Sequence, residues 1–407
     1  MNFAISYAKN DKGYFLTTNQ GGEFQRLAYR DFKTSKFTTI TQDIDWNVSS
    51  FTLSHKGNRA AFTVNQDGIS QLYLLDTKSF KYQVVKGIPI GLISGLTFSP
   101  NDKKLAMSLN TSQTPSDSFI LTLKRSATQY EDITRWTYSE VGGLNTELFV
   151  VPELVRFESF DKRQIPAFVY KPNKEGPNPV IISIHGGPEG QARPYFSSNN
   201  QLWLNTLGAA VITPNVRGSA GYGKEYIGLD NGFKREDSVK DIGALLDWIA
   251  TQPDLDANRV ALIGGSYGGY MVLASAVHYS DRLKAAVDIV GISNFVTFLE
   301  NTKDYRRDLR RVEYGDERIP EMHAQLQAIS PSNNADKINV PMFVVQGQND
   351  PRVPVTEAEQ IVKAMRDSGK KVWYMNALNE GHGYRKKENS DIYQQAVVLF
   401  FQQNLLN

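Results

Sequence analysis

The sequence changes its pattern near residue 145, and this change limits the possible fold more than any other feature. Before it, apolar residues alternate in short runs separated by turn residues, as in residues 71–75, which is typical of β-strands. From about residue 148 onward, apolar strands alternate with amphipathic helices, which predicts a mostly parallel sheet with helices on both faces. We therefore expect an all-β domain over residues 1–145 and a doubly wound α/β domain over residues 146–407.

The first part of the chain contains a repeat. Residues 51–62 align with residues 96–107, and a weaker copy begins near Tyr7. A period of roughly 40 to 50 residues, each unit carrying several short strands, is typical of propeller blades. An ordinary β-sandwich with an accidental repeat is the alternative. We count about three blades, over residues 1–40, 47–87 and 91–135.

Three blades do not close a propeller, because closure needs roughly 4 to 8 blades so that the first and last sheets cover each other's edges. The sequence favours a chain that is the C-terminal part of a longer protein with a partial propeller. Packing of the blades on a second copy is the other interpretation. Exposed blade edges would favour self-association, so a homo-oligomer is also an open expectation.

Charge and composition exclude several classes of function. The chain has 45 basic and 43 acidic residues, so its formal charge of +2 provides no strong field for nucleic acid or an anionic membrane. The basic stretch at residues 305–311 is expected to be a solvated helix face. With no cysteine, disulfides, thiolate metal sites and cysteine nucleophiles are excluded. The first residues do not form a signal peptide and no apolar run could span a bilayer, so we expect a cytoplasmic protein.

In the second part, apolar runs predict strands at residues 180–184, 209–213, 260–263, 285–290, 342–345 and 371–375, with helices at residues 238–250, 268–277, 356–367 and 392–403. Doubly wound sheets place their sites at the carboxyl ends of the strands. Candidate catalytic residues are therefore sought there.

Residues 264–269, Gly-Gly-Ser-Tyr-Gly-Gly, lie between a predicted strand and a predicted helix. A nucleophile elbow needs small residues around its serine, because the sharp strand-to-helix turn strains the backbone and brings other chain segments close. Ser266 is the predicted nucleophile. The alternative is a glycine-rich helix start capped by a serine.

A serine hydroxyl needs a base, and the base needs a carboxylate to hold its tautomer. In this fold the chain order is nucleophile, acid, histidine. Of the histidines that follow Ser266, His278 lies on the helix leaving the elbow and His323 precedes the best acid candidate. His382, in a glycine-flanked turn after the last predicted strand, remains as the base.

Asp350 is the predicted acid, because it leaves the strand at residues 342–345 at its carboxyl end. It could instead simply begin a turn before Pro351. Asp288 is the rival acid, but it lies inside a predicted strand.

The tetrahedral oxyanion needs donors already aimed at it. The amide of Tyr267, directly after the nucleophile, is one predicted donor. The second is the amide of Gly187, with Gly186 as a fallback, because the His-Gly-Gly-Pro turn at residues 185–188 follows an earlier strand. A simple tight turn is the alternative for this segment.

Five motifs occur in order: His-Gly-Gly-Pro at 185–188, Asn-Val-Arg-Gly-Ser-Ala-Gly-Tyr-Gly at 215–223, Gly-Gly-Ser-Tyr-Gly-Gly-Tyr at 264–270, Asp-Pro-Arg-Val-Pro at 350–354 and Gly-His-Gly at 381–383. Together they resemble the prolyl oligopeptidase family of serine peptidases, and look closest to its acylaminoacyl-peptidase-like branch. The resemblance covers residues 148–407 closely and extends weakly through the blade repeats.

The resemblance implies a cytosolic-type peptidase for short peptides, with a propeller restricting access and a triad of Ser266, Asp350 and His382. Some relatives carry a tyrosine whose hydroxyl completes the oxyanion hole. This chain has His185 there, so a backbone amide must serve instead. By the same matching, Arg217 faces the substrate, and Phe295, Phe298 and Val353 line its pocket; ordinary packing is the alternative for all four.

The sequence therefore predicts a serine peptidase that forms an acyl-enzyme and needs no metal or organic cofactor. Whether it would act as an acylaminoacyl-peptidase, a dipeptidyl-peptidase or an oligopeptidase stays open. One rival is a carboxylesterase of the same fold, since acyl transfer to serine does not distinguish esters from amides. The other is a catalytically silent binding module.

Overall fold

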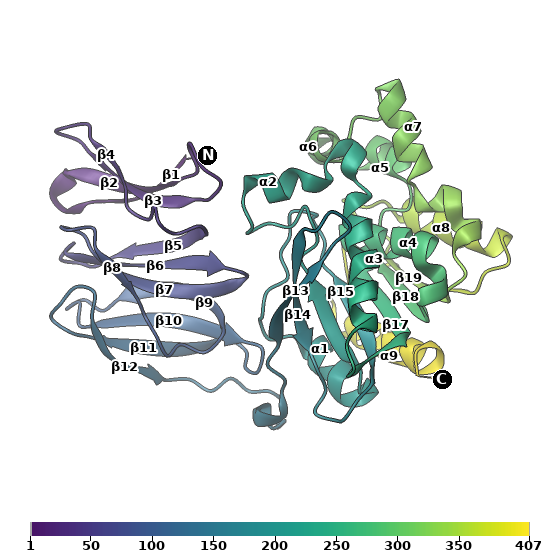
Figure 1. The fold of residues 1–407 in the computed structure, drawn as a ribbon, viewed down its shortest axis with the longest axis horizontal. Helices are drawn as coiled ribbons and strands as arrows, with labels where there is room; N and C mark the ends of the chain where they lie inside the picture. Colours follow the sequence, from purple (N-terminus) through teal and green to yellow (C-terminus); the bar gives the residue numbers. More distant parts are fainter. Residues whose placement is uncertain (1, 407) are drawn as a thin grey trace. The chain divides into compact units, whose positions relative to one another are not determined.

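The computed structural model describes residues 2–406, which divide into two compact units that we describe separately (Figure 1). The first unit runs to Val151 and includes the short segments Arg193–Ser197 and Gly221–Glu225. The second comprises Pro152–Ala192, Ser198–Ala220 and the chain from Tyr226 onward.

The first unit contains three four-stranded antiparallel sheets, each made of consecutive strands (Figure 1). Their strands are β1 (Asn2–Tyr7), β2 (Gly13–Thr18), β3 (Arg26–Asp31) and β4 (Phe37–Thr39); β5 (Asn47–Leu53), β6 (Arg59–Gln66), β7 (Ile69–Asp76) and β8 (Tyr82–Val84); and β9 (Gly91–Phe98), β10 (Lys104–Thr111), β11 (Asp117–Leu123) and β12 (Tyr130–Arg135). The hairpin between β6 and β7 shows why consecutive strands pair with each other. Asp67 and Gly68 both have positive φ, as a two-residue turn that matches strand twist requires.

Successive sheets of this unit pack face to face. Phe15 and Leu27 of the first sheet share one core with Phe62 of the second. Leu72 of the second sheet shares another core with Leu105 of the third. The three sheets therefore have the layered, blade-like arrangement that the repeat predicted.

The second unit is built on an eight-stranded sheet with the order β13-β14-β16-β15-β17-β18-β19-β20. The strands are β13 (Glu153–Glu158), β14 (Gln164–Tyr170), β15 (Asn178–Ile184), β16 (Ala210–Pro214), β17 (Leu255–Gly265), β18 (Ala285–Ile289), β19 (Met342–Gly347) and β20 (Val372–Ala377). The pairs β13–β14 and β14–β16 are antiparallel, and the others are parallel. Every residue of β19 is buried, as expected for a parallel strand covered on both faces.

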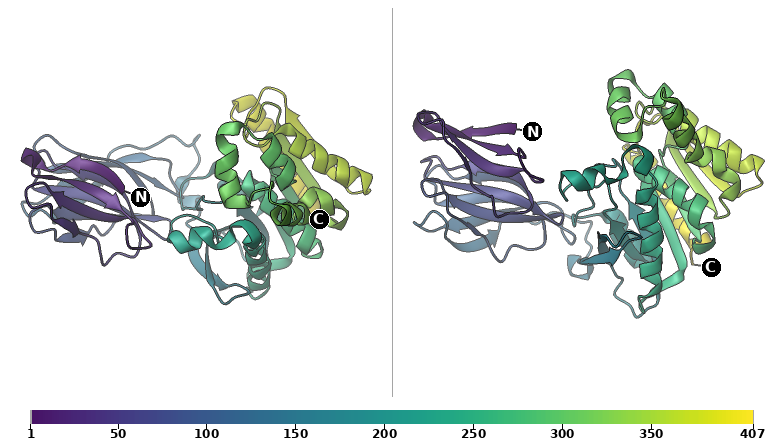
Figure 2. Two further views of the ribbon diagram at one scale, coloured as in Figure 1. Left: turned by 90° about the horizontal axis from the view of Figure 1, so that it is seen from above. Right: turned by 45° about the horizontal axis from the view of Figure 1, so that its top comes forward.

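Helices cover both faces of this sheet (Figures 1 and 2). The helices are α1 (Ser198–Leu202), α2 (Lys224–Ile227), α3 (Asp237–Ala250), α4 (Tyr267–Tyr279), α5 (Phe295–Asn301), α6 (Asp304–Tyr314), α7 (Pro320–Ala328), α8 (Val355–Asp367) and α9 (Lys387–Asn404), with the helical turn η3 at Trp203–Leu207. Helices α3, α4 and α8 pack on one face, while α9 packs with η3 on the other through Trp203 and Phe401. Helices α5, α6 and α7 form an excursion between β18 and β19.

The predicted fold class is confirmed: an α/β-hydrolase sheet with an N-terminal all-β, propeller-like part. All six predicted strands and all four predicted helices are present, although α9 begins at Lys387 rather than at residue 392. The antiparallel strands β13 and β14 and the helices α5 and α7 were not predicted. Within the described residues, no helix has the length and apolar character needed to cross a membrane.

Candidate active site

Ser266 lies at the end of β17 in a backbone conformation that few non-glycine residues adopt, with φ 59° and ψ −120°. The surrounding glycines make this turn sterically possible. A β-carbon on Gly264 would stand 2.4 Å from the carbonyl oxygen of Gly268, and one on Gly268 would stand 2.2 Å from that of Ile184. The Ser266 amide donates to the carbonyl of Ile289 at 2.8 Å, which ties the turn to β18. This geometry is that of a strained nucleophile elbow.

Tyr267 is the first residue of α4, directly after the elbow. The first amides of a helix have no intrahelical acceptor, so its N–H is available to another acceptor. Its side chain points into the protein and is buried, with the hydroxyl donating to Asp230 Oδ2 at 3.0 Å. The buried side chain of Tyr267 therefore holds in place the residue whose amide is a predicted oxyanion donor.

The turn at residues 185–188 lies directly against the elbow. A β-carbon on Gly186 would stand 3.3 Å from the Cβ of Ser266 and 2.8 Å from the carbonyl oxygen of Gly265. His185 holds the turn, because its Nδ1 lies 2.9 Å from the Gly186 oxygen and its Nε2 lies 2.9 Å from Ser219 Oγ. Burial lowers the pKa of His185, so this imidazole is neutral. The structure thus brings the expected oxyanion turn and Ser266 together.

Asp350 and His382 form a hydrogen-bonded pair, with Nδ1 of the imidazole 2.7 Å from Oδ2 of the carboxylate. The other oxygen of Asp350 accepts from the amides of Arg352 at 2.7 Å and Val353 at 3.0 Å. The Asp350 carboxylate is fully buried and thus fixed at both oxygens. Because Nδ1 carries the proton donated to Asp350, Nε2 of His382 is left as the basic nitrogen.

The segment that carries His382 is tied to the segment that carries Asp350. The Asn349 amide donates to the Glu380 carbonyl at 2.9 Å, and its side chain donates to the Leu378 carbonyl at 2.9 Å. Glu380 in turn accepts from the Lys386 amide at 2.8 Å. The turn that carries the imidazole is therefore hydrogen-bonded to the segment that carries the acid.

Among the described residues, no hydrogen bond joins the Ser266 hydroxyl to the His382 imidazole. Such contacts are often long in ligand-free enzymes and tighten when substrate binds. The other two histidines after the elbow are engaged elsewhere: His278 lies 2.7 Å from Glu236, and His323 Nδ1 lies 3.0 Å from the Glu317 carbonyl oxygen.

Arg217 does not have the surroundings of a substrate-facing residue. Its guanidinium donates to Asp241 at 2.8 Å and to Asp161 at 3.1 Å, and it lies 4.3 Å from the ring of Phe160. The side chain is only 3% exposed. These partners within the protein explain why an arginine is present here, with no need for a contact to substrate.

The three apolar residues expected in the substrate pocket are Phe295, Phe298 and Val353, and all are buried. The ring of Phe295 packs 4.5 Å from that of Tyr270 and 5.1 Å from that of Tyr314. These side chains therefore support other residues from behind and present almost no open surface of their own.

The expectation that residues 305–311 form a solvated helix face is correct only in part. Tyr305 and Leu309 of α6 are exposed, but Arg310 and Arg311 are mostly buried. Arg310 donates to the carbonyl of Gly187 at 3.2 Å, and Arg311 pairs with Glu317. Sequence reasoning missed Arg310, because its partners Gly187 and Glu189 lie far away along the chain.

Asp288, the rival acid, is buried in β18 beneath the elbow. No described group donates a well-aligned hydrogen bond to either of its oxygens, although the nearby Gly291 amide partly offsets the effect of burial. Burial raises the pKa of Asp288 to about 7. Among the described residues, no histidine forms a hydrogen bond with Asp288, in contrast to Asp350.

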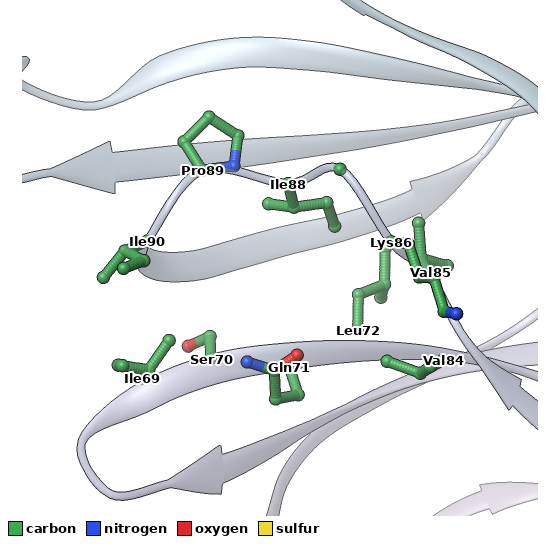
Figure 3. Close-up of a pocket in the computed structure, with 11 residues that line it drawn as sticks. Ile69, Ser70, Gln71, Leu72, Val84, Val85, Lys86, Ile88, Pro89 and Ile90 are labelled. Carbon is green, nitrogen blue, oxygen red and sulfur yellow. The ribbon is translucent and has the colours of Figure 1, made fainter.

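The first unit contains a pocket of about 350 Å³ between β7 and residues 84–90 (Figure 3). Ser70, whose side chain bears a hydroxyl group, lines this pocket. Its lining is otherwise mostly aliphatic, with Gln71 and Lys86 but no histidine or carboxylate to activate a hydroxyl. Within the described residues, no group of three or more histidine, aspartate or glutamate side chains could hold a metal ion.

The sheet order, together with a strained serine turn after β17, defines an α/β-hydrolase of the serine-nucleophile class. A sequence profile described as the prolyl oligopeptidase family matches residues 194–407. The chain therefore belongs to the prolyl oligopeptidase family, as its five motifs predicted.

Relatives within the family carry several peptidase names. The chain is 28% identical, over 97% of its length, to 58% of the dipeptidyl aminopeptidase BIII of Pseudoxanthomonas mexicana. It is 34% identical, over 56% of its length, to 31% of the dipeptidyl peptidase family member 6 of Caenorhabditis elegans. The chain thus spans about a third to somewhat over half of the length of these two relatives.

Solved structures agree on the fold. A puromycin-hydrolyzing peptidase of Mycobacterium tuberculosis superposes with a TM-score of 0.85 at 20% identity, over 99% of this chain and 62% of that one. The acylaminoacyl peptidase of Pyrococcus horikoshii superposes with a TM-score of 0.78 at 22% identity, over 99% of this chain and 63% of that one.

Proposed function

We propose that this chain is a serine peptidase for short peptides, with Ser266 as nucleophile, His382 as base and Asp350 as the group that orients the base. The observation that carries the proposal is the 2.7 Å hydrogen bond between Nδ1 of His382 and Oδ2 of Asp350. It leaves Nε2 free to accept a proton, on a turn tied to the same end of the sheet as the Ser266 elbow.

In the proposed reaction, the Ser266 hydroxyl gives its proton to Nε2 of His382 as Oγ bonds to the scissile carbonyl carbon. The charge on the carbonyl oxygen is met by the amides of Tyr267 and Gly187. The protonated imidazole then donates to the leaving amine, and the carbon–nitrogen bond breaks to give an ester on Ser266. Water, deprotonated by the same imidazole, hydrolyses that ester and restores the hydroxyl.

We further propose that residues 146–407 form the catalytic domain and residues 1–145 a domain of about three blades. All three residues of the proposed triad lie within residues 146–407. The match over 97% of the chain to a dipeptidyl aminopeptidase supports a substrate with a free amino end. The acylaminoacyl peptidase among the structural neighbours supports the alternative of a substrate with a blocked amino end.

Hydrolysis of chromogenic amides and esters tests this function directly. We expect release of nitroaniline from dipeptidyl or blocked aminoacyl nitroanilides by the wild-type chain, and none by Ser266→Ala. The ratio of the hydrolysis rates of substrates with free and with blocked amino ends would identify which amino end is preferred. Hydrolysis of nitrophenyl esters alone would instead identify a carboxylesterase, and no hydrolysis of any substrate by a folded chain would contradict both.

A fluorophosphonate probe gives a second test that needs no choice of substrate. We expect covalent labelling of the wild-type chain that is lost in Ser266→Ala, since only an activated serine reacts with this reagent. Equal labelling of the two proteins would favour the silent binding module.

A further inference from the structure

The C-terminal end of α6 lies against the proposed oxyanion turn. Arg310 Nη1 donates to the carbonyl oxygen of Gly187 at 3.2 Å, and the Tyr314 hydroxyl donates to the same oxygen at 3.3 Å. We propose that Arg310, Glu313 and Tyr314, which we call the α6 clamp, position the Gly187 amide for the oxyanion. This inference rests on the proposed function, because it assigns a task to residues that support that site.

Gly187 has a backbone conformation that only glycine adopts readily. Its φ is +138°, and a β-carbon there would stand 2.4 Å from the amide nitrogen of Gly190, so the turn accepts only glycine. Glycine has the greatest backbone freedom of any residue and no side chain to pack. Two hydrogen bonds to its carbonyl oxygen limit rotation of the adjoining peptide units, and so limit the direction of its N–H.

Arg310 is in turn held by two carboxyl groups. It donates to Glu313, one helical turn further along α6, and to Glu189 Oε2 at 3.3 Å. Its side chain is only 12% exposed, and a guanidinium so buried is stable only with partners. Glu189 lies two residues after Gly187, so the clamp grips the turn at two points.

The pKa values of the two carboxyl groups, Glu313 of the clamp and Glu189 of the turn, shift in opposite directions. Burial raises the pKa of Glu313 to about 9, with the nearby Glu189 adding to the rise and Arg235 and Arg310 opposing it. Burial also acts to raise the pKa of Glu189, but the hydrogen bond from Glu313 and the charge of Arg310 outweigh it, and the net shift is downward. The raised pKa favours the protonated form of Glu313 at neutral pH, whereas the lowered pKa favours the ionised form of Glu189.

The same network reaches the other proposed oxyanion donor. Arg235 is fully buried, and its guanidinium lies 5.2 Å from the ring centre of Tyr267 and 4.9 Å from that of Tyr314. It donates to the Tyr267 hydroxyl at 3.1 Å and to the Glu313 carbonyl at 2.8 Å. The rings of Tyr267 and Tyr314 also stack at 6.0 Å.

Both proposed donors are therefore anchored in one buried network. Stabilisation of a developing oxyanion depends on donors that are already aimed before the reaction begins. The clamp residues contact the carbonyl of Gly187 and not the reacting atoms, so they are positioning residues.

Kinetics of labelling by a fluorophosphonate, with hydrolysis of a nitroanilide in parallel, test the clamp. We expect Tyr314→Phe and Arg310→Gln each to lower the labelling rate and kcat about three- to tenfold, as the loss of one hydrogen bond predicts. Because the Gly187 amide acts on the transition state, KM should change much less. Arg310→Lys, which keeps one donor, should recover part of the loss.

The matched control is Arg311→Gln. Arg311 lies on the same helix with a similar exposure but pairs with Glu317, so its loss should leave labelling unchanged. Thermal unfolding of every variant separates a change in reactivity from a loss of fold. If Arg310→Gln does not fold, Tyr314→Phe carries the test, because it removes only a single oxygen atom.

The pH profile gives a readout that a merely structural role would not produce. Glu313 is faced by Arg310 and Tyr314 on α6, by Glu189 on the turn and by Arg235 from before α3. Its ionisation places two carboxylates side by side, so the wild-type labelling rate should fall above about pH 9. Glu313→Gln keeps a donor that cannot ionise, and should retain its rate at that pH.

The outcomes distinguish the clamp from the proposed function. Labelling of the wild-type chain that Tyr314→Phe, Arg310→Gln and Glu313→Gln leave unchanged at every pH would overturn the clamp while the function stands. Absence of Ser266-dependent labelling in the wild-type chain would overturn both. Slower labelling in the clamp variants, together with an unchanged Arg311→Gln, supports the proposal.

Discussion

A β-carbon placed on Gly347 would stand 2.1 Å from the carbonyl oxygen of Gly381, the residue before His382. The last residue of β19 therefore touches the backbone of the turn that carries the proposed base. We predict that Gly347→Ala displaces this turn and lowers kcat by at least about a hundredfold, since misplacement of a catalytic group by about 1 Å has that effect.

Circular dichroism and thermal unfolding of Gly347→Ala check that the fold persists. Gly369→Ala is not a suitable control because its φ is +72°, whereas Gly228→Ala is suitable because its β-carbon would meet no atom within 4 Å. Full activity in Gly347→Ala would show that the turn does not need its present position.

Asp350→Asn tests which acid orients His382. The amide cannot stabilise the imidazolium and favours the wrong tautomer, so we expect a fall in kcat of about three to four orders of magnitude, the size found for such changes in serine peptidases. Asp288→Asn should change kcat less than about threefold, since Asp288 has no histidine partner. Parallel assays of the two variants decide between the acids, and a larger loss in Asp288→Asn would reverse the assignment.

Asp288 should also make folding stability depend on pH. Burial raises the pKa of this carboxyl to about 7, above the value of roughly 4 expected when unfolded. The protonated form is favoured in the folded state, so its contribution is complete below about pH 4 and is lost as the pH rises through about 7. We predict that the melting temperature falls less steeply between pH 5 and 8 in Asp288→Asn than in the wild type. An equal dependence of the melting temperature on pH in the two proteins would contradict the raised pKa of Asp288.

Arg217→Gln tests whether Arg217 serves folding or substrate binding. The change leaves the buried Asp241 carboxylate without its guanidinium partner. We predict a loss of about 3 kcal/mol in unfolding free energy, measured by urea denaturation, with KM unchanged for the fraction that remains folded. Arg318→Gln, which breaks the more exposed pair with Asp316, should lose less than about 1 kcal/mol. A raised KM in Arg217→Gln with normal stability would restore the substrate-contact interpretation.

The elbow at Ser266 shows what local sequence can predict. Its glycines are required by backbone contacts within a few residues and by the adjoining strand, so they can be recognised from the motif and its flanking apolar runs. The same holds for the order of Asp350 and His382 after the nucleophile, because short loops leave each parallel strand at the same edge of the sheet. Strands β13 and β14 escaped prediction because neither is followed by an α-helix, unlike the other strands of the eight-stranded sheet.

The sequence by itself determined the two kinds of fold, the family and the three residues proposed as the triad, because these follow from periodicity and from motifs of a few residues. Only the tertiary structure decided that Arg217 is engaged by Asp241, that Phe295 is buried behind Tyr314, and that Arg310 turns inward to Gly187. The physical reason is that a charged or aromatic side chain takes its role from partners distant along the chain. Arg310 looks like any solvated arginine in the sequence, and its task is set by a carbonyl oxygen more than a hundred residues away.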